Sequence, residues 1–248
     1  MANLLNTIIL CSQRFSEACL PSQCLLCHLP SQQSLICDSC YQATLVERPC
    51  CLHCGCGLSN TQPFCGECLK HAFDFNQLHA VASYQKPFPE LIKQLKYQHQ
   101  LIYADLLGLL LASSIKQRYD IQSLKKIDYL IPVPLHIKKL RKRGFNQTQL
   151  ISNALLKHLS IPMLGDQFII RNKPTNAQEG LTRIQRSKNL SDAFSLTEVG
   201  IKILQGKNVV LLDDVVTTGA TINSLCQCLL SADVKKIDVW CICRTELE

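Results

Sequence analysis

From about residue 75 onward, the chain alternates apolar segments with segments of helical periodicity. Residues 79–84 look extended, whereas the apolar residues of 88–95 recur at the i, i+3, i+4 and i+7 spacing of an amphipathic helix. Further strands are expected at 127–133, 209–212 and 237–243, and further helices at 103–117, 146–159 and 220–231. Alternating strands and helices predict an α/β fold with a parallel, doubly wound sheet.

The first 70 residues lack this pattern and are rich in cysteine. Of 16 cysteines, 12 lie before residue 69. Four CxxC pairs stand out: Cys24 and Cys27, Cys37 and Cys40, Cys51 and Cys54, Cys65 and Cys68. Two such pairs complete the tetrahedral set of four thiolates that Zn²⁺ prefers, and a closed set leaves no position for water. We therefore expect one or two structural zinc ions, with sequential and interleaved pairing both compatible with the spacing.

A disulfide framework or a redox-active CxxC motif is the rival interpretation of these cysteines. The start of the chain has neither the basic region nor the small-residue cleavage site of a secretory signal, so reduced thiols in a cytoplasmic protein are expected. Zinc would also fold a segment too short to build its own core. The later cysteines are expected to pack in or near the core: Cys226, Cys228, Cys241 and Cys243. No apolar run approaches the ~18 residues of a membrane span.

Charge also separates the two parts of the chain. Residues 1–70 carry three basic and four acidic side chains, whereas the remainder carries 23 basic and 15 acidic ones. We expect a small zinc-binding module at 1–70, of the double zinc-ribbon type, and a larger α/β domain at 71–248. The basic balance of the larger domain suits a phosphorylated or nucleic-acid ligand.

Two adjacent carboxylates, Asp213 and Asp214, follow the strand at 209–212. A hydroxyl-rich turn that opens a helix comes next: Thr217, Thr218, Gly219, Ala220 and Thr221. Ligands of parallel sheets bind beyond the carboxyl ends of strands. Carboxylates accept hydrogen bonds from ribose hydroxyls, and free N–H groups at a helix N-terminus hold phosphate. A ribose 5-phosphate fits both, with Mg²⁺ offsetting the charge. Adjacent acids that only cap a helix or face water are the alternative.

A basic run follows the strand at 127–133 and is expected to form a second loop of the site. It comprises Lys138, Lys139, Arg141, Lys142 and Arg143, with Phe145 as an aromatic neighbour. Closely spaced cations suit a diphosphate or a nucleic-acid backbone, and Phe145 either stacks on a base or packs inward. A third basic segment, around Arg183, Arg186 and Lys188, has the composition of a mobile lid or of an ordinary surface helix.

With these motifs the chain resembles the ComF family of competence-associated, phosphoribosyltransferase-like proteins. The resemblance rests on the cysteine-rich start and on residues 91–97, 133–135, 143–147, 186–190, 213–219 and 240–244. It implies a type I phosphoribosyltransferase fold whose motif for phosphoribosyl diphosphate (PRPP) is residues 213–221. In that pattern Asp213 and Asp214 meet the ribose hydroxyls, residues 217–221 hold the 5-phosphate, and the loop after Val133 lies where pyrophosphate is held.

The resemblance further implies a competence accessory protein for natural transformation, which handles incoming single-stranded DNA during DNA uptake. Its place would be the cytoplasm, either at large or at the inner face of the membrane through partner proteins of the competence machinery. Two alternatives remain open: an active PRPP-dependent transferase of unknown acceptor, and a PRPP sensor without turnover. The sequence assigns no catalytic residue and no nucleobase pocket.

Overall fold

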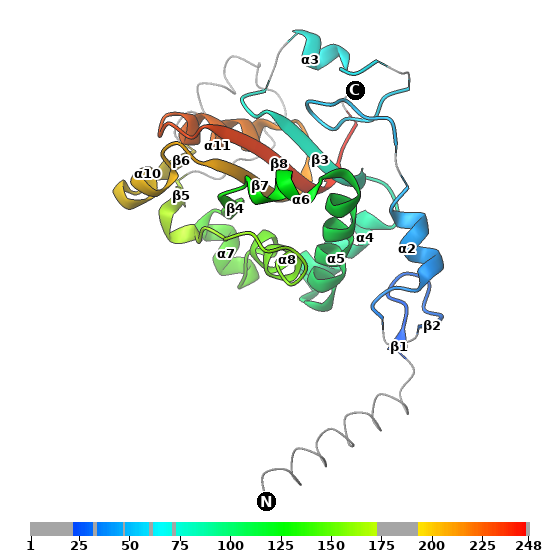
Figure 1. Cartoon of the computed structure of the whole chain (residues 1–248). Helices are drawn as coiled ribbons and strands as arrows, with labels where there is room; N and C mark the ends of the chain where they lie inside the picture. Colours follow the sequence, from blue (N-terminus) through cyan, green and yellow to red (C-terminus); the bar gives the residue numbers. More distant parts are fainter. Residues whose placement is uncertain are drawn as a thin grey trace, which may run out of the picture. The chain divides into compact units, whose positions relative to one another are not determined.

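The protein is described here by a computed structural model (Figure 1) that covers residues 22–31, 34–46, 48–59, 62–70, 73–172 and 193–246. The chain divides into two compact units, residues 1–46 and residues 47–248. The expected boundary at residue 70 falls inside the second unit, and as a folding boundary it stays a prediction. The lid candidates Arg183, Arg186 and Lys188 lie outside the described residues.

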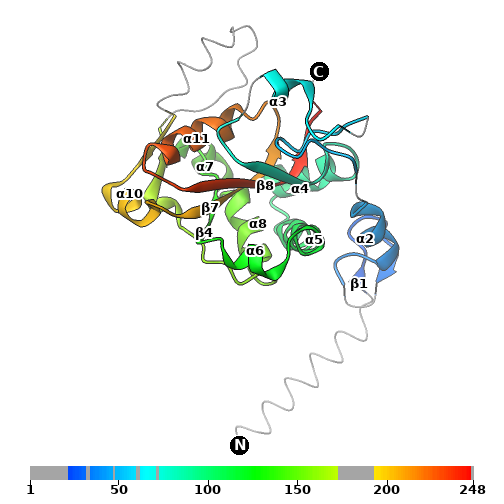
Figure 2. The ribbon, with the colours of Figure 1, turned by 45° about the horizontal axis from the view of Figure 1, so that its top comes forward.

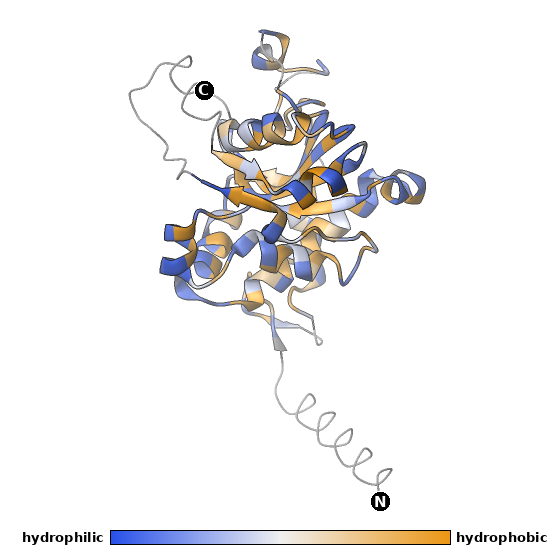
Figure 3. Ribbon diagram, turned by 90° about the vertical axis from the view of Figure 1, so that its left-hand side faces the viewer, coloured by the Kyte–Doolittle hydropathy of each residue, from blue (hydrophilic) through white to orange (hydrophobic). Residues whose placement is uncertain are grey.

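The second unit is built on a parallel sheet of four strands in the order β3-β8-β7-β4. The strands are β3 (Gln77–Ser83), β4 (Tyr129–Pro132), β7 (Asn208–Val216) and β8 (Lys236–Arg244). Because both faces of a parallel sheet are covered, its strands are expected to be almost continuously apolar. In β8 every residue after Lys236 is buried, and Figure 3 shows the sheet strands as mainly hydrophobic. The predicted parallel sheet is confirmed.

Helices cover both faces of this sheet. They are α4 (Phe88–Gln98), α5 (Ile102–Arg118), α6 (Ile121–Lys125), α7 (Ile137–Arg143), α8 (Gln147–Leu155), α10 (Glu198–Leu204) and α11 (Ala220–Leu230). In Figures 1 and 2, α5 and α8 lie on one face and α11 on the other. The apolar stripe of α11, Ile222, Leu225 and Leu229, packs into a core cluster that includes Leu211 and Val239. The stripe predicted for α4 is buried as well.

The basic run at 137–143 is a helix, so the expectation of a loop is wrong. The ring nitrogen Nδ1 of His136 accepts a hydrogen bond from the backbone N–H of Lys138 at 3.2 Å and caps the start of α7. Gly144 ends the helix in the left-handed conformation, with φ of 81°. Lysine, arginine and leucine are good helix formers, and these two caps suffice to close a helix of two turns. Helix α8 begins three residues later, capped by Asn146.

Short elements complete the two units. A second small sheet pairs β5 (Ile169–Arg171) with β6 (Phe194–Leu196), preceded by the 3₁₀ turn η1 (Asp166–Phe168). The cysteine-rich segments contain β1 (Ser22–Gln23), β2 (Pro30–Ser31), α2 (Asp38–Thr44) and α3 (Gly66–Lys70). Among the described residues, no helix has both the length and the apolarity that a membrane crossing requires.

Candidate functional site

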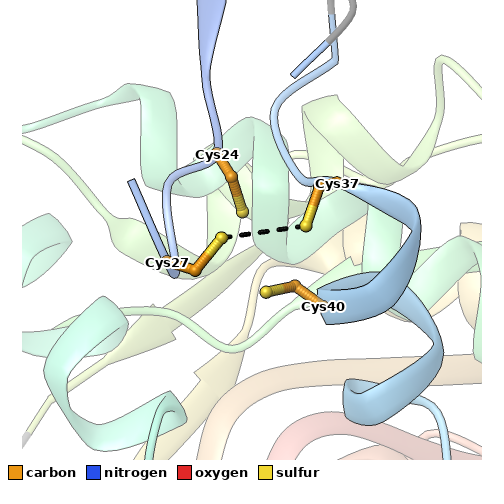
Figure 4. Close-up of side chains that lie close together, drawn as sticks. All are labelled: Cys24, Cys27, Cys37 and Cys40. Atoms are coloured by element: carbon orange, nitrogen blue, oxygen red, sulfur yellow. Dashed lines mark hydrogen bonds between the residues drawn. The ribbon is translucent and has the colours of Figure 1, made fainter. Parts of the chain in front are cut away.

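The first unit gathers Cys24, Cys27, Cys37 and Cys40 around one point (Figure 4), with their sulfur atoms all within 4.8 Å of one another. The Sγ atoms of Cys27 and Cys37 are 3.8 Å apart. Tetrahedral zinc with Zn–S bonds of about 2.3 Å places its sulfur ligands roughly 3.8 Å apart. The donor set and its spacing therefore fit Zn²⁺, and the pairing is sequential.

The ionisation of these thiols also suits a metal. Burial would raise the pKa of Cys24, but hydrogen bonds from the backbone N–H groups of Cys27 and Cys37 lower it to about 6. Burial, with the neighbouring thiols adding to it, raises the pKa of Cys40 to about 12. Close thiols cannot all ionise without a cation between them, and a divalent metal supplies that cation.

A second group of four thiols, Cys51, Cys54, Cys65 and Cys68, lies in the second unit, again within 4.8 Å of one another. The Sγ atoms of Cys54 and Cys65 are 3.5 Å apart. Burial would raise the pKa of Cys51, but hydrogen bonds from the backbone N–H groups of Cys54 and Cys65 lower it to about 7. This second cysteine cluster therefore has the same chemistry as the first and also fits a structural Zn²⁺.

The second cysteine cluster packs directly on the sheet. The backbone carbonyl of His53 accepts a hydrogen bond from the N–H of Leu78 in β3 at 2.7 Å. Its ring nitrogen Nε2 lies 2.8 Å from the carbonyl oxygen of Phe75. The rings of Phe73 and Phe75 stack at 5.0 Å between centroids, with His53 edge-on to both. The second cysteine cluster is therefore linked to the sheet of the second unit by a backbone hydrogen bond and by the packed rings of His53, Phe73 and Phe75.

The acidic pair lies near the carboxyl end of β7, and its two side chains have different surroundings. Adjacent residues of a strand point to opposite faces. Asp214 is 4 % exposed; it forms an ion pair with Lys96 of α4, and its Oδ1 accepts from Nε2 of Gln147 at 3.2 Å. Asp213 is only partly buried, and its Oδ1 accepts from the backbone N–H of Asp214 at 2.8 Å. The protein holds Asp214 from two helices and leaves Asp213 more open.

These surroundings shift the pKa values of the two carboxyl groups in opposite directions. Burial would raise the pKa of Asp214, but the charge of Lys96 and its hydrogen bond lower it. Burial raises the pKa of Asp213 to about 8, and the neighbouring charge of Asp214 adds to this. The surroundings therefore favour the ionised form of Asp214 and the protonated form of Asp213, and a bound cation would favour ionisation of Asp213 as well.

Four cations converge on the acidic pair from three elements. Lys96 comes from α4, Lys139 and Arg143 from α7, and Arg171 from β5. Partial desolvation lowers the pKa of Lys139, and the like charges of its neighbours Arg171, Arg143 and Lys96 lower it further. Burial lowers the pKa of Arg171, opposed by the charge of Asp213. Cations close enough to depress one another's pKa form a site of strongly positive potential, which favours an anionic ligand.

The hydroxyl-rich turn after β7 presents its backbone at the start of α11. Thr217 and Thr218 are exposed, and Gly219 begins the helix in the left-handed conformation with φ of 78°. A side chain on Gly219 would lie 2.8 Å from the ring of Phe73. Residues 217–221 form what we call the phosphate loop. The backbone N–H groups at the N-terminus of an 11-residue helix can hold a phosphate.

An aromatic pair lies beside the basic helix α7. The guanidinium of Arg143 lies over the ring of Tyr97, 5.6 Å from its centroid, and Arg143 also donates to Oε1 of Gln147. Phe145 is half-buried, and its ring meets that of His99 edge-to-face at 5.6 Å. Lys138, Lys139, Arg141 and Lys142 are exposed. The role predicted for Phe145 on a base is not tested by this contact and stays a prediction.

Comparison with known proteins identifies the relatives of this chain. A family model described as a phosphoribosyl transferase domain matches residues 149–246. The DNA utilization protein YhgH of Shigella flexneri is 34% identical over 227 residues, which cover 91% of this chain and 98% of the relative. Competence protein F of Haemophilus influenzae is 34% identical over 224 residues, which cover 90% of this chain and 96% of the relative.

The chain belongs to the ComF family. The family match confirms the predicted phosphoribosyltransferase domain, since residues 149–246 include β7, the phosphate loop and β8. A solved structure of the allosteric regulatory enzyme of purine biosynthesis aligns with a TM-score of 0.35 and 19% identity, covering 56% of this chain and 25% of that one. A likeness this low carries no weight.

Four polar residues of this ComF-family site were assigned no role from the sequence: Lys96, Gln147, Arg171 and Arg244, whose guanidinium donates to the carbonyl oxygens of Val216 and Thr217. Lys96, Gln147 and Arg244 lie in the segments 91–97, 143–147 and 240–244, on which the family resemblance rests, so the sequence marked these segments but not the role of each side chain. Arg171 lies in a strand of three residues and has no local signal. Arg244 ends an apolar strand, where a charged residue is unusual, and the structure leaves it 2 % exposed.

Proposed function

We propose that this ComF-family protein binds PRPP with Mg²⁺, or the 5′-phosphate end of a DNA strand, at residues 213–221. In this role it serves as an accessory protein that handles incoming single-stranded DNA. The observation that supports the proposal most directly is the convergence of Lys96, Lys139, Arg143 and Arg171 on the acidic pair. Such a site accepts a ligand that carries several negative charges on a sugar.

The division between the two acids suits a ribose. Because Asp214 is held by Lys96 and Gln147, it is a rigid support rather than a free ligand group. The more open Asp213 is placed to accept hydrogen bonds from ribose hydroxyls, and Mg²⁺ would favour its ionised form. The phosphate loop, which follows Asp214 after two intervening residues, would then hold the 5-phosphate.

Helix α7 provides a surface for the remaining phosphates. Its exposed basic residues can bind the pyrophosphate of PRPP or the backbone of a DNA strand. The exposed ring of Tyr97 lies next to Arg143, so a base and a phosphate can be bound side by side. The names of the relatives, a DNA utilization protein and a competence protein, agree with a role in DNA handling.

Calorimetric titration of the zinc-loaded full chain tests the proposal. PRPP with Mg²⁺ and a short 5′-phosphorylated single strand are titrated separately and then in competition. Thr218→Glu places a negative charge in the phosphate loop and should abolish PRPP binding. Ser231→Glu, which adds the same charge at the exposed far end of α11, is the matched control and should leave it unchanged.

Three results would distinguish the possible functions of the site. A wild-type protein that binds neither ligand would show the proposal to be wrong. Binding of PRPP that survives Thr218→Glu would move the ligand away from the phosphate loop. Release of pyrophosphate from PRPP upon addition of a nucleobase would identify an active transferase instead of a binding protein.

A further inference from the structure

Arg244, the last residue of β8, is a buried guanidinium that joins the second cysteine cluster to the phosphate loop. Only 2 % of the residue is exposed. Its Nε donates to the carbonyl oxygen of Cys54 at 3.0 Å, and its Nη1 donates to the carbonyl oxygen of Val216 at 3.0 Å and to that of Thr217. One rigid fork of donors therefore contacts a cysteine of the cluster and the first residue of the phosphate loop.

These contacts orient the backbone that would bind a ligand. In a trans peptide the C=O and the following N–H point in opposite directions. When Arg244 holds the carbonyl of Thr217 on the buried side, the N–H of Thr218 in the same peptide plane points away from Arg244. Thr217 and Thr218 are exposed, so this N–H is directed to the open side of the loop.

An aromatic contact provides a second link between the same two places. The ring of Phe73 lies where a side chain on Gly219 would be, only 2.8 Å from an ideal Cβ. Phe73 stacks on Phe75, and His53, the neighbour of Cys54, lies edge-on to both rings. The position of Gly219 at the start of α11 is thereby coupled to the segment that carries the second cysteine cluster.

The segment at 48–70 depends on its metal ligands for its own order. Its buried hydrophobic cluster consists of Cys51, Cys54 and Cys56, with Leu58, Cys65, Cys68 and Phe73 packed against them. A segment whose buried core is made mainly of thiols folds when a metal draws these thiols together. Without the metal, the acceptor at Cys54 and the packing at Phe73 lose their fixed positions.

We infer that Arg244 is a positioning residue through which the second cysteine cluster preorganises the phosphate loop. The loop presents its N–H groups to a phosphate only while this cluster is assembled, and the first cysteine cluster has no such effect. The inference deepens the proposed function, on which its ligand-binding arm rests. It assigns the zinc site of the second unit to the binding site and not only to folding.

The test compares the two cysteine clusters in the full chain. Cys65→Ser with Cys68→Ser removes half of the second cluster, and Cys37→Ser with Cys40→Ser removes the equivalent half of the first. Each variant should lose one equivalent of zinc. Affinity for Mg²⁺-PRPP, measured by calorimetry, should fall at least about tenfold in the second-cluster variant, because small displacements of binding groups are costly. It should stay at the wild-type value in the first-cluster variant.

A third variant covers the case in which the second-cluster variant fails to fold. Arg244→Lys keeps the charge and both zinc ions but cannot reach the carbonyls of Cys54 and Thr217 together. It should keep the wild-type circular dichroism and zinc content, weaken PRPP binding, and speed amide exchange at Asn223, whose N–H donates to the carbonyl oxygen of Gly219 at the start of α11. Exchange at Asn223 should also speed up when a chelator strips zinc from the wild-type protein.

Amide exchange separates the inference from the proposed function. If the wild-type protein does not bind PRPP, the proposed function fails, and exchange at Asn223 still decides the coupling. Exchange at Asn223 that is unchanged in Arg244→Lys, or PRPP binding that is unchanged in both the second-cluster variant and Arg244→Lys, would overturn the inference. An equal loss of binding in the two cluster variants would overturn its specificity for the second cluster.

Discussion

At the scale of single residues, the ion pair of Lys96 and Asp214 is the contact on which the acidic pair depends. The side chains are 18% and 5% exposed, so both charges are largely removed from water. A buried pair is neutral or costly as a whole, but removal of one partner leaves the other charge uncompensated. The charge of Lys96, which forms an ion pair with Asp214, lowers the pKa of this carboxyl and favours its ionised form.

Lys96→Met should therefore lower the free energy of unfolding by about 3–5 kcal/mol, because Asp214 would remain as an unpaired buried carboxylate. Lys93→Met is the matched control, since Lys93 is exposed on the same helix and its loss should change stability by less than about 0.5 kcal/mol. Denaturant unfolding measures both. Adding Asp214→Asn to Lys96→Met should recover part of the loss. Equal stability of the two lysine variants would contradict the assignment.

At the scale of secondary-structure elements, α7 divides its charges between two tasks. Arg143 is engaged with Gln147 and Tyr97, whereas Lys138 and Arg141 are exposed one turn apart. Cations that contact DNA phosphates release counterions, so the affinity for single strands depends on salt. Lys138 and Arg141 are therefore the residues of α7 whose contacts with bound DNA should contribute to the salt dependence of the affinity.

Lys138→Gln with Arg141→Gln should weaken binding of a short single strand and reduce its salt dependence. The slope of log affinity against log salt should fall by about 1.4, at about 0.7 per phosphate contact of a single strand. Lys116→Gln with Lys125→Gln removes the same charge from exposed positions on α5 and α6 and should leave the slope unchanged. If both variants shift the slope equally, the effect comes from net charge and α7 is not the contact.

The elements also show what the sequence could reveal. Periodicity located the amphipathic helix α4 and the apolar face of α11, whereas α5 and the strands of the main sheet were recognised as long apolar segments. It did not predict β5 and β6, since strands of three residues carry no period. The helix α7 was missed because its charged residues suggested a solvent-exposed loop, although His136 and Gly144 are good capping residues.

The site itself was predictable only where its residues adjoin in sequence. One continuous motif contains Asp213, Asp214 and residues 217–221, and the spacing of the CxxC pairs predicts the metal ligands. Lys96, Arg171 and Arg244 come from three other elements and reach the site through the fold. Their contacts depend on strand order and helix packing, which one sequence does not specify locally. Sequential pairing of the cysteines likewise required the structure.

At the scale of the whole molecule, the acidic pair links stability to pH. Asp213 has a folded-state pKa raised to about 8, whereas in the unfolded chain it returns to the ordinary value of 3.8. Between these two values the folded state holds a proton that the unfolded state has released. Stability must therefore fall as pH rises through this window and level off above it. Asp214, with a lowered pKa, acts in the opposite sense, and its contribution is lost only as pH falls below its ordinary pKa.

Asp213→Asn removes the contribution of Asp213 to the pH dependence of stability and keeps that of Asp214. The variant should gain stability relative to the wild type as pH rises from about 4 to about 8, with no further gain above, when unfolding free energies are measured by denaturant at fixed zinc. Groups that do not contact Asp213 titrate equally in both proteins and cancel in the difference, and Asp214, whose pKa is lowered, titrates below this pH window. Asp120→Asn is the control, because hydrogen bonding to Ser123 lowers the pKa of Asp120 and its effect should be flat from pH 5 to 8. A stability difference for Asp213→Asn that is the same at pH 5 and pH 8 would mean that this carboxyl is ionised at neutral pH. The unliganded site would then hold two anions, which four converging cations would have to offset without the help of Mg²⁺.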